Sequence, residues 1–250
     1  LASPLRDVYK RQQQDLHCQK RCQICLSSRH MSCLVYRSGN LMRDKVRFSA
    51  SVLCLLATAI MLTIYLAWLL YPIEISYFNL PDKVYLKSET IQYNFNILMN
   101  YLTNPFSQKL AMPDFRSSAA GLHHFQAVKY LFHLAQAIFL VTLPALIFFV
   151  KKVVKKGLLG LYRRVFLLIC LLPLILVGLV FLIGFNNFFT LFHQVLFVGD
   201  STWLFDPAKD PVIWILPEEF FMHAFILFAL LYEGIFSTLY FLSRKVKLLT

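Results

Sequence analysis

Long apolar runs alternate with polar segments along this chain. Four of the runs are long enough to cross a bilayer core of ~30 Å, which takes about 20 helical residues. They cover residues 48–70, 130–150, 165–185 and 220–242. Because these runs contain almost no charged residues, the pattern predicts four transmembrane helices and an all-α membrane protein.

The segment between the first two runs, residues 71–129, is too long to be a simple loop. Its first part, residues 73–86, is rich in β-branched and aromatic residues and is broken by Pro81-Asp82, which predicts short extended pieces or a hairpin. Farther on, apolar side chains recur at helical spacing, which predicts an amphipathic helix that lies along the membrane surface or packs on the bundle. These side chains are Ile91, Phe95, Leu98 and Leu102.

A polar stripe crosses the start of the second run. Its members, at offsets of three, four and three, are Gln126, Lys129, His133 and Gln136. Because these offsets keep side chains on one helix face, we expect the stripe to point into the bundle. His123 is in phase with it, whereas His124 lies about 100° farther round the helix. Periodicity alone therefore favours His123 for the buried face, and Ser117 or Ser118 is the expected cap of this helix.

A second polar stripe follows the third run. Asn186, Thr190 and His193 recur at offsets of four and three, and His193 is its last member. Two interpretations remain open for these residues. They either hydrogen-bond across helices, as Asn and Thr do in many membrane bundles, or they take part in chemistry. A histidine is suited to proton transfer because its pKa lies near ambient pH.

Composition supports the membrane class. Hydrophobic residues make up 58% of the 250 residues, aromatic residues 16%, and charged residues only 15%, which excludes an ordinary soluble domain. The net charge of +12 raises the question of nucleic-acid binding. The basic residues instead cluster at the ends of the apolar runs, as in membrane proteins, so we expect no nucleic-acid partner.

The distribution of charge predicts the orientation. Basic clusters precede the first run, fill the connection between the second and third runs, and follow the fourth run, which marks these segments as cytoplasmic. They consist of Arg43, Lys45, Arg47, Lys151, Lys152, Lys155, Lys156, Arg163, Arg164, Arg244, Lys245 and Lys247. Segments 71–129 and 186–219 carry relatively more acidic residues and are expected to face outward. Both termini are then cytoplasmic.

The first 42 residues stand apart from this pattern. The opening LASPLRDVYKRQ resembles adapter-derived sequence, so we expect residues 1–42 to be a disordered or partly non-native extension and residues 43–250 to form the membrane domain. Four cysteines lie close together in the extension and loosely match zinc-site spacing, although cytoplasmic thiols also simply remain reduced. They are Cys18, Cys22, Cys25 and Cys33.

Other motifs carry less information. Glu219 and His223 are four residues apart and can bind a metal, but no third ligand of matching spacing accompanies them. Asp206-Pro207 and Asp210-Pro211 are expected to be turns whose carboxylates accept backbone amides. The sequence contains no Gly-rich phosphate loop, GxSxG elbow or HExxH motif.

Two stretches of the chain resemble the bacterial lipoprotein intramolecular transacylase family, Lit. They are residues 94–134, with NYLTNPFSQKLAMPDF and GLHHFQAVKYLFH, and residues 185–221. The most specific part is the order FH, F, W-x-F-D-P, D and P-E-x-F-F, and the resemblance covers roughly residues 43–247. Ala127 departs from the family, because many members carry an acid there.

The resemblance implies an activity and a site. The sn-2 acyl chain of a diacylglyceryl-cysteine moves to its α-amino group, in a diacylated lipoprotein of the bacterial cytoplasmic membrane, with no cofactor and no metal. We expect His193 to be the base and His124 to position or protonate the glyceryl oxygen, on the outward face. The supporting candidates are His123, Lys129, Asn186, Thr190, Trp203, Asp206 and Glu218.

Two other classes of function remain. One is a non-enzymatic small transporter or structural membrane protein, although the halves show no inverted repeat. The other is an intramembrane metal-dependent hydrolase that uses His123, His124, His193 and His223. A stoichiometric metal content would distinguish the hydrolase from a histidine-based acyl transfer.

Overall fold

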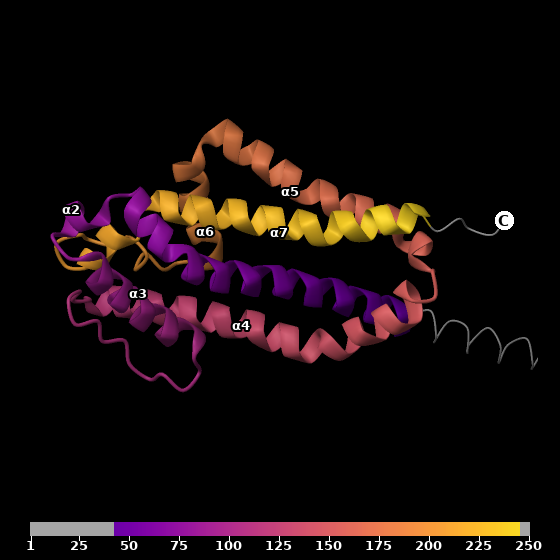
Figure 1. Ribbon diagram of the computed structural model, residues 1–250, viewed down its shortest axis with the longest axis horizontal. Coiled ribbons are helices and arrows are strands. Elements are labelled where there is room, and N and C mark those ends of the chain that lie inside the picture. Colours follow the sequence, from indigo (N-terminus) through magenta and orange to yellow (C-terminus); the bar gives the residue numbers. More distant parts are fainter. Residues whose placement is uncertain (1–42, 246–250) are drawn as a thin grey trace, which may run out of the picture. The chain divides into compact units, whose positions relative to one another are not determined.

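The computed structural model describes the backbone of residues 43–245, of which residues 50–245 belong to one compact unit that contains the candidate site (Figure 1). Four helices are long and apolar enough to cross a membrane, which confirms the four predicted spans. They are Arg43–Tyr77, Ala119–Val154, Leu159–Ile183 and Glu218–Arg244. Each is longer than its apolar run, because helix formation continues into the flanking polar residues. The predicted extension 1–42, with its cysteines, lies outside the described residues.

The predicted extended or hairpin segment at residues 73–86 is wrong. The first helix continues to Tyr77, and α2 (Leu80–Val84) follows it. Asn79 and Tyr85 flank α2 in the left-handed conformation, with φ of 49° and 54°. Pro81 lies in the first turn of α2, where its fixed φ suits a helix start, so Pro81-Asp82 marks a helix and not a strand break. No strand occurs anywhere in residues 43–245.

The amphipathic helix predicted after this segment is confirmed as α3 (Ser88–Thr103). All four of its predicted apolar positions are buried. Phe95 stacks on Tyr71 of the first helix with 3.5 Å between ring centroids, and the Tyr71 hydroxyl donates to the Ile215 carbonyl at 2.6 Å. The main hydrophobic core therefore lies at the end of the bundle that carries α2 and α3, which we call the α3 end.

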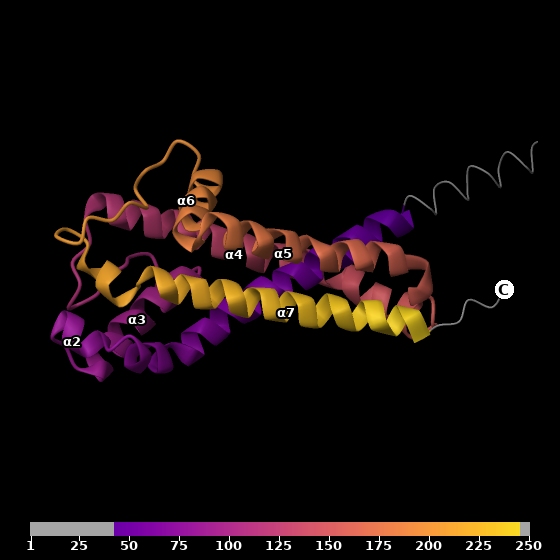
Figure 2. The same ribbon diagram turned by 90° about the horizontal axis from the view of Figure 1, so that it is seen from above.

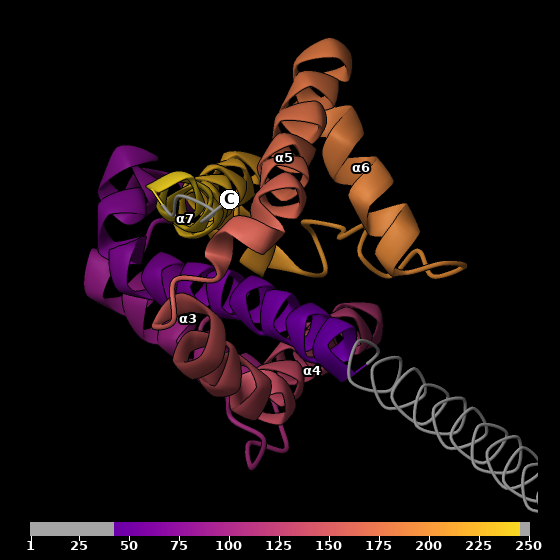
Figure 3. The ribbon, with the colours of Figure 1, turned by 90° about the vertical axis from the view of Figure 1, so that its right-hand side faces the viewer.

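The remaining long helices are α4 (Ala119–Phe149), α5 (Arg163–Ile183) and α7 (Glu218–Lys245). A π-helical turn, η1 (Val150–Val154), and a 3₁₀ turn, η2 (Leu159–Tyr162), connect α4 to α5. The helix α5 packs along α7, and α3 packs on α4, as Figure 3 shows in the end-on view. The basic connection between α4 and α5 is thus at the end of the bundle opposite α3 (Figure 1).

The chain reverses after α5 at Gly184. This residue has φ 80° and ψ 153°, a conformation that is essentially restricted to glycine. The short helix α6 (Phe185–Leu196) therefore starts in a new direction and folds back against α5. The segment after α6 loops out, passes the start of α4 and reaches α7 through the 3₁₀ turn η3 (Pro211–Ile215) (Figure 2).

Candidate functional site

Two histidines from different helices meet near the α3 end. His124 lies in the second turn of α4 and His193 in the last turn of α6, with 5.9 Å between ring centroids. Phe197 packs against both rings, at 4.9 Å from His124 and 5.8 Å from His193. Phe205 packs on His124 at 5.5 Å, which leaves this histidine only 6% exposed. The pair lies among aromatic side chains, and we call it the histidine pair.

A backbone hydrogen bond determines the tautomer of His193. Its Nδ1 is 2.8 Å from the carbonyl oxygen of Phe189, one turn earlier in α6. Because a carbonyl oxygen can only accept, Nδ1 carries the proton and Nε2 keeps its lone pair in the neutral ring. Burial lowers the pKa of His193 from its ordinary value, and the bond to the Phe189 carbonyl opposes that effect. The neutral ring of His193 therefore presents Nε2 as a proton acceptor.

Trp203 forms one wall of the histidine pair. Its ring stacks on His193 with 4.8 Å between centroids and 28° between planes, and its Nε1 donates to the backbone carbonyl of Asp200 at 3.1 Å. The rings of Phe189 and Phe192 also pack against His193, with centroid distances of 4.3 and 5.7 Å, respectively. The tryptophan of the W-x-F-D-P motif thus orients an imidazole.

One nitrogen of His124 lacks a protein partner. Its Nδ1 is enclosed and accepts or donates no hydrogen bond within the described part of the chain. An enclosed polar atom without a partner costs about 1–3 kcal/mol. A hydrogen bond between this nitrogen and a bound substrate would account for that cost.

The structure buries His124 and exposes His123, so the preference of periodicity for His123 is wrong. The reason is that Lys129 and Gln136 of the polar stripe face α3 and the loop after it. Gln126, the first member of the stripe, is instead exposed and donates to the Tyr130 hydroxyl at 3.1 Å, so the expectation that the stripe points into the bundle is wrong at that position. Lys129 donates to the Ser107 carbonyl and lies 4.4 Å from the Tyr101 ring centroid, and Gln136 donates to the Thr103 carbonyl at 3.0 Å. The segment after α6 covers a different side of α4, the side that carries His124.

The other candidate residues are spread over the same region. The side chain of Asn186 donates to Glu218 at 3.0 Å and so connects the starts of α6 and α7. Thr190 is half-buried on α6, one turn before His193. Asp206 accepts from the Ala208 amide at 3.0 Å and pairs with Lys209, so its carboxylate stabilises a turn, as predicted. The structure therefore brings Trp203 to the histidine pair and leaves Lys129 and Asp206 in other contacts.

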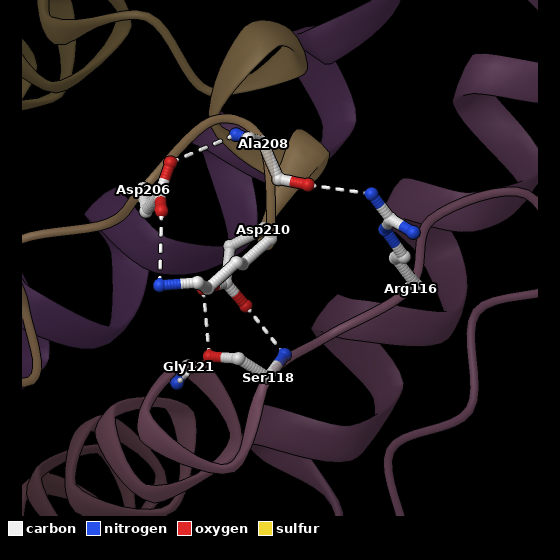
Figure 4. Close-up of polar contacts among 7 residues, drawn as sticks. Arg116, Ser118, Gly121, Asp206, Ala208 and Asp210 are labelled. Carbon is white, nitrogen blue, oxygen red and sulfur yellow. Dashed lines mark hydrogen bonds and ion pairs between the residues drawn. The ribbon is translucent and has the colours of Figure 1, made fainter.

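Asp210 fastens the loop to the start of α4, as Figure 4 shows. The carboxylate is 3% exposed and accepts from both the amide and the hydroxyl of Ser118, each at 2.7 Å. Ser118 is the N-cap of α4, one of the two predicted caps, and it accepts from the Gly121 amide at 3.0 Å. We expected Asp210 to accept its own backbone amides. It instead bridges two segments, a long-range contact for which local sequence gives no signal.

Asp200 is a further residue that the sequence reasoning missed. Its Oδ2 is 3.2 Å from Nε2 of His123, and its Oδ1 accepts from the Thr202 amide at 2.8 Å. The hydrogen bond from the Thr202 amide lowers the pKa of Asp200, and His123 adds to this effect. Asp200 borders a hollow of about 320 Å³. The other lining residues are Gln194, Phe197, Gly199, Ser201, Trp203 and Leu204.

His223 does not pair with Glu219. Its Nδ1 lies 3.0 Å from a carboxylate oxygen of Glu74 on the first helix, and Phe78 stacks on its ring. Within residues 43–245, no group of three or more His, Cys, Asp or Glu side chains is arranged to hold a metal ion.

Comparisons with known proteins agree on one family. The family model "Lipoprotein intramolecular transacylase Lit" matches residues 46–221. A solved structure of the membrane integral lipoprotein intramolecular transacylase Lit from Bacillus cereus is 31% identical, with a TM-score of 0.73 over 83% of this chain and 96% of that chain. Two structures of that Bacillus cereus protein with one histidine replaced, by arginine or by alanine, give TM-scores of 0.68 and 0.69 at 31% identity. Each covers 85% of this chain, and 94% and 96% of that chain, respectively. No curated protein matches the chain.

Proposed function

This chain belongs to the lipoprotein intramolecular transacylase family Lit, and on that premise we propose how its side chains transfer an acyl group within one lipoprotein. The family makes it a membrane-integral acyltransferase that acts on lipoproteins. In the proposed reaction, the sn-2 acyl chain of a diacylglyceryl-cysteine moves to the α-amino group of that cysteine. The product is an N-acyl, lyso-glyceryl lipoprotein.

The histidine pair is the observation that carries the proposal. The amine nitrogen attacks the ester carbonyl carbon, and Nε2 of His193 takes a proton from it as the C–N bond forms. The tetrahedral intermediate then breaks its C–O bond, and the glyceryl oxygen gains a proton. His124, whose ring is 5.9 Å from that of His193, positions or protonates this oxygen. A neutral amine loses one proton and the alcohol gains one, so no cofactor or co-substrate is consumed.

The surroundings of the histidine pair suit an intramolecular transfer. Amine and ester belong to one molecule, so holding them in contact removes much of the entropic barrier. Water would compete by hydrolysing the ester. The phenylalanine rings around the pair oppose this by limiting the access of water. They belong to Phe189, Phe192, Phe197 and Phe205.

We further propose the orientation of the protein in the membrane. The basic connection between α4 and α5 lies at the end of the bundle opposite the start of α4 (Figure 1). His124 of the histidine pair lies in the second turn of α4, and so at the opposite end from this connection. Because basic loops stay in the cytoplasm, both termini are cytoplasmic and the histidine pair faces outward. A lipoprotein anchored in the outer leaflet presents its modified cysteine at that same side.

Mass spectrometry of a lipoprotein tests the proposed function. N-terminal lipopeptides are isolated from cells with and without this protein, and fragmentation locates each acyl chain, because the transfer conserves mass. One chain should appear as an amide on cysteine only when the protein is present. The variant His193→Ala should lose this product by about 10²-fold or more, since a general base contributes that much to the rate.

Asn187→Ala provides a matched control on the same helix. Asn187 is exposed, and among residues 43–245 its side chain donates only to the Ile183 carbonyl, one turn earlier. This variant should keep the amide product at the level of the unaltered protein. A diacylglyceryl-cysteine that stays unchanged in the presence of well-expressed protein would contradict the transacylase function, and full activity in His193→Ala would contradict the role of the base.

A further inference from the structure

A carboxylate borders the hollow beside the histidine pair. Phe197 and Trp203 line this hollow and also contact His193, so the hollow and the pair share walls. Asp200 lies in the same lining, with its side chain 25% exposed. Asp200 takes no part in the proton transfers between His193, His124 and the substrate.

The negative charge of Asp200 is only weakly compensated. Its Oδ1 is occupied by the Thr202 amide, and its Oδ2 has His123 as a partner, a histidine whose side chain is 62% exposed. Within residues 43–245, no Lys or Arg forms an ion pair with Asp200. The carboxylate is therefore available to a cation that enters the hollow.

The substrate of the proposed reaction contains such a cation. An α-amino group has a pKa of about 7.7–8.0, so it is largely an ammonium group at neutral pH. We propose that Asp200 binds the α-ammonium group of the lipoprotein beside the histidine pair, an inference that rests on the proposed function. The charge-assisted hydrogen bond then positions the future nucleophile within reach of Nε2 of His193.

Proton balance adds a role for His123. An ammonium group must lose two protons to become an amide, and the glyceryl oxygen takes only one. The second proton goes to water, and the imidazole of His123, which is exposed and 3.2 Å from Asp200, can carry it there. The amide product has no charge, so Asp200 binds the substrate and releases the product.

Binding of unreactive substrate analogues tests this inference independently of catalysis. Two diacylglyceryl lipopeptides carry an ether in place of the sn-2 ester, one with a free α-amine and one with an N-acetyl group. Their affinity for the full chain in micelles is measured by displacement of a fluorescent lipopeptide. At pH 6.5 the free amine should bind about tenfold more tightly than the N-acetyl analogue, as expected for a hydrogen bond between charged groups.

The preference should depend on charge at both partners. It should disappear at pH 9, where the amine is neutral, and in Asp200→Asn at pH 6.5. Asp200→Glu should keep it. Glu89→Gln is the matched control, because it removes an acidic charge from the exposed first turn of α3 and should leave the preference unchanged.

Each outcome has one meaning. Equal binding of both analogues to the unaltered protein, or a preference that survives in Asp200→Asn, overturns the inference and leaves the transacylase function intact. If Asp200→Asn fails to fold, the pH dependence of the preference in the unaltered protein and the binding to Asp200→Glu still test the inference. A preference that persists at pH 9 cannot come from the ammonium charge and would overturn it. Failure of both analogues to bind the unaltered protein overturns the inference and the proposed function together.

Discussion

At the residue scale, His193 is subject to two opposing influences. Its aromatic surroundings disfavour the charged imidazolium, whereas the Phe189 carbonyl favours it by accepting the Nδ1 proton. Burial is the larger effect, so the pKa of His193 lies below 6.5. A base is available above its pKa and is lost as the pH falls through it. His193 therefore remains a neutral base in more acid solution than an ordinary histidine does.

NMR titration of the His193 ring in micelles measures this pKa. The Cε1 resonance, assigned by its absence in His193→Gln, should give a pKa below 6.5. Trp203→Ala uncovers one face of the ring and should raise the pKa toward the ordinary value, because it restores solvation of the imidazolium. A pKa of 6.5 or higher in the unaltered protein would contradict the effect of burial.

Some site residues could be predicted from sequence and others could not. The resemblance to the family singles out His193 and Trp203, whereas helical spacing places Asn186 and Thr190 on the same face as His193. Nothing in the local sequence singles out Asp200, because its ion pair with His123 forms only when the segment after α6 folds over α4. The choice between His123 and His124 failed for the same reason: the periodicity of α4 does not tell which side another segment covers.

At the element scale, the start of α4 is the part that orients His124. Ser118 caps the helix, and Asp210 binds Ser118 from the loop that also carries Phe205. Gly121 makes this approach possible. A Cβ at that position would lie 2.3 Å from Oδ1 of Asp210 and 3.2 Å from the Phe205 ring.

Gly121→Ala should therefore separate the loop from the helix. We expect a loss of about 1–3 kcal/mol, as for overpacking of a tight contact, and lower acyl transfer because the cover of His124 moves. Thermal unfolding in micelles measures the first effect and lipopeptide fragmentation the second. Gly178→Ala in α5 is the control, since a Cβ there has no neighbour within 4 Å. Equal stability of Gly121→Ala and the unaltered protein would contradict the importance of this contact.

The helices themselves were predictable where apolar periodicity is long. The four spans and the buried face of α3 follow from hydrophobic pattern alone. The segment 73–86 was assigned wrongly because β-branched and aromatic residues favour strands only when a sheet is there to receive them. In this helical bundle, the same residues instead form the end of the first helix and α2. The separate helix α6 depends on the glycine-only conformation at Gly184, which the apolar run 165–185 conceals.

At the scale of the whole molecule, charge separates the two ends of the bundle. The connection between α4 and α5 is strongly basic and contains no acidic residue, whereas the loop after α6 carries Asp200, Asp206 and Asp210. This asymmetry supports the proposed orientation, with the histidine pair toward the outside.

Cysteine labelling tests the orientation directly. Ser201→Cys, in the loop after α6, should react with a membrane-impermeant maleimide in intact spheroplasts. Lys156→Cys, in the basic connection, should react only after permeabilisation. Labelling of the unaltered protein gives the background reaction of its own six cysteines, of which Cys54 and Cys170 lie within spans. The reverse pattern of labelling would show that the protein is inserted the other way round.

The hydrogen bond from Nδ1 of His193 to the Phe189 carbonyl has a consequence for sequence variation. The acceptor belongs to the main chain, so it is retained whichever side chain occupies position 189. Substitutions there can reshape the aromatic lining without changing which nitrogen of His193 is protonated, provided that α6 remains helical. The main chain of α6 therefore determines which nitrogen of His193 is protonated, and the side chains that line the site can change without altering it.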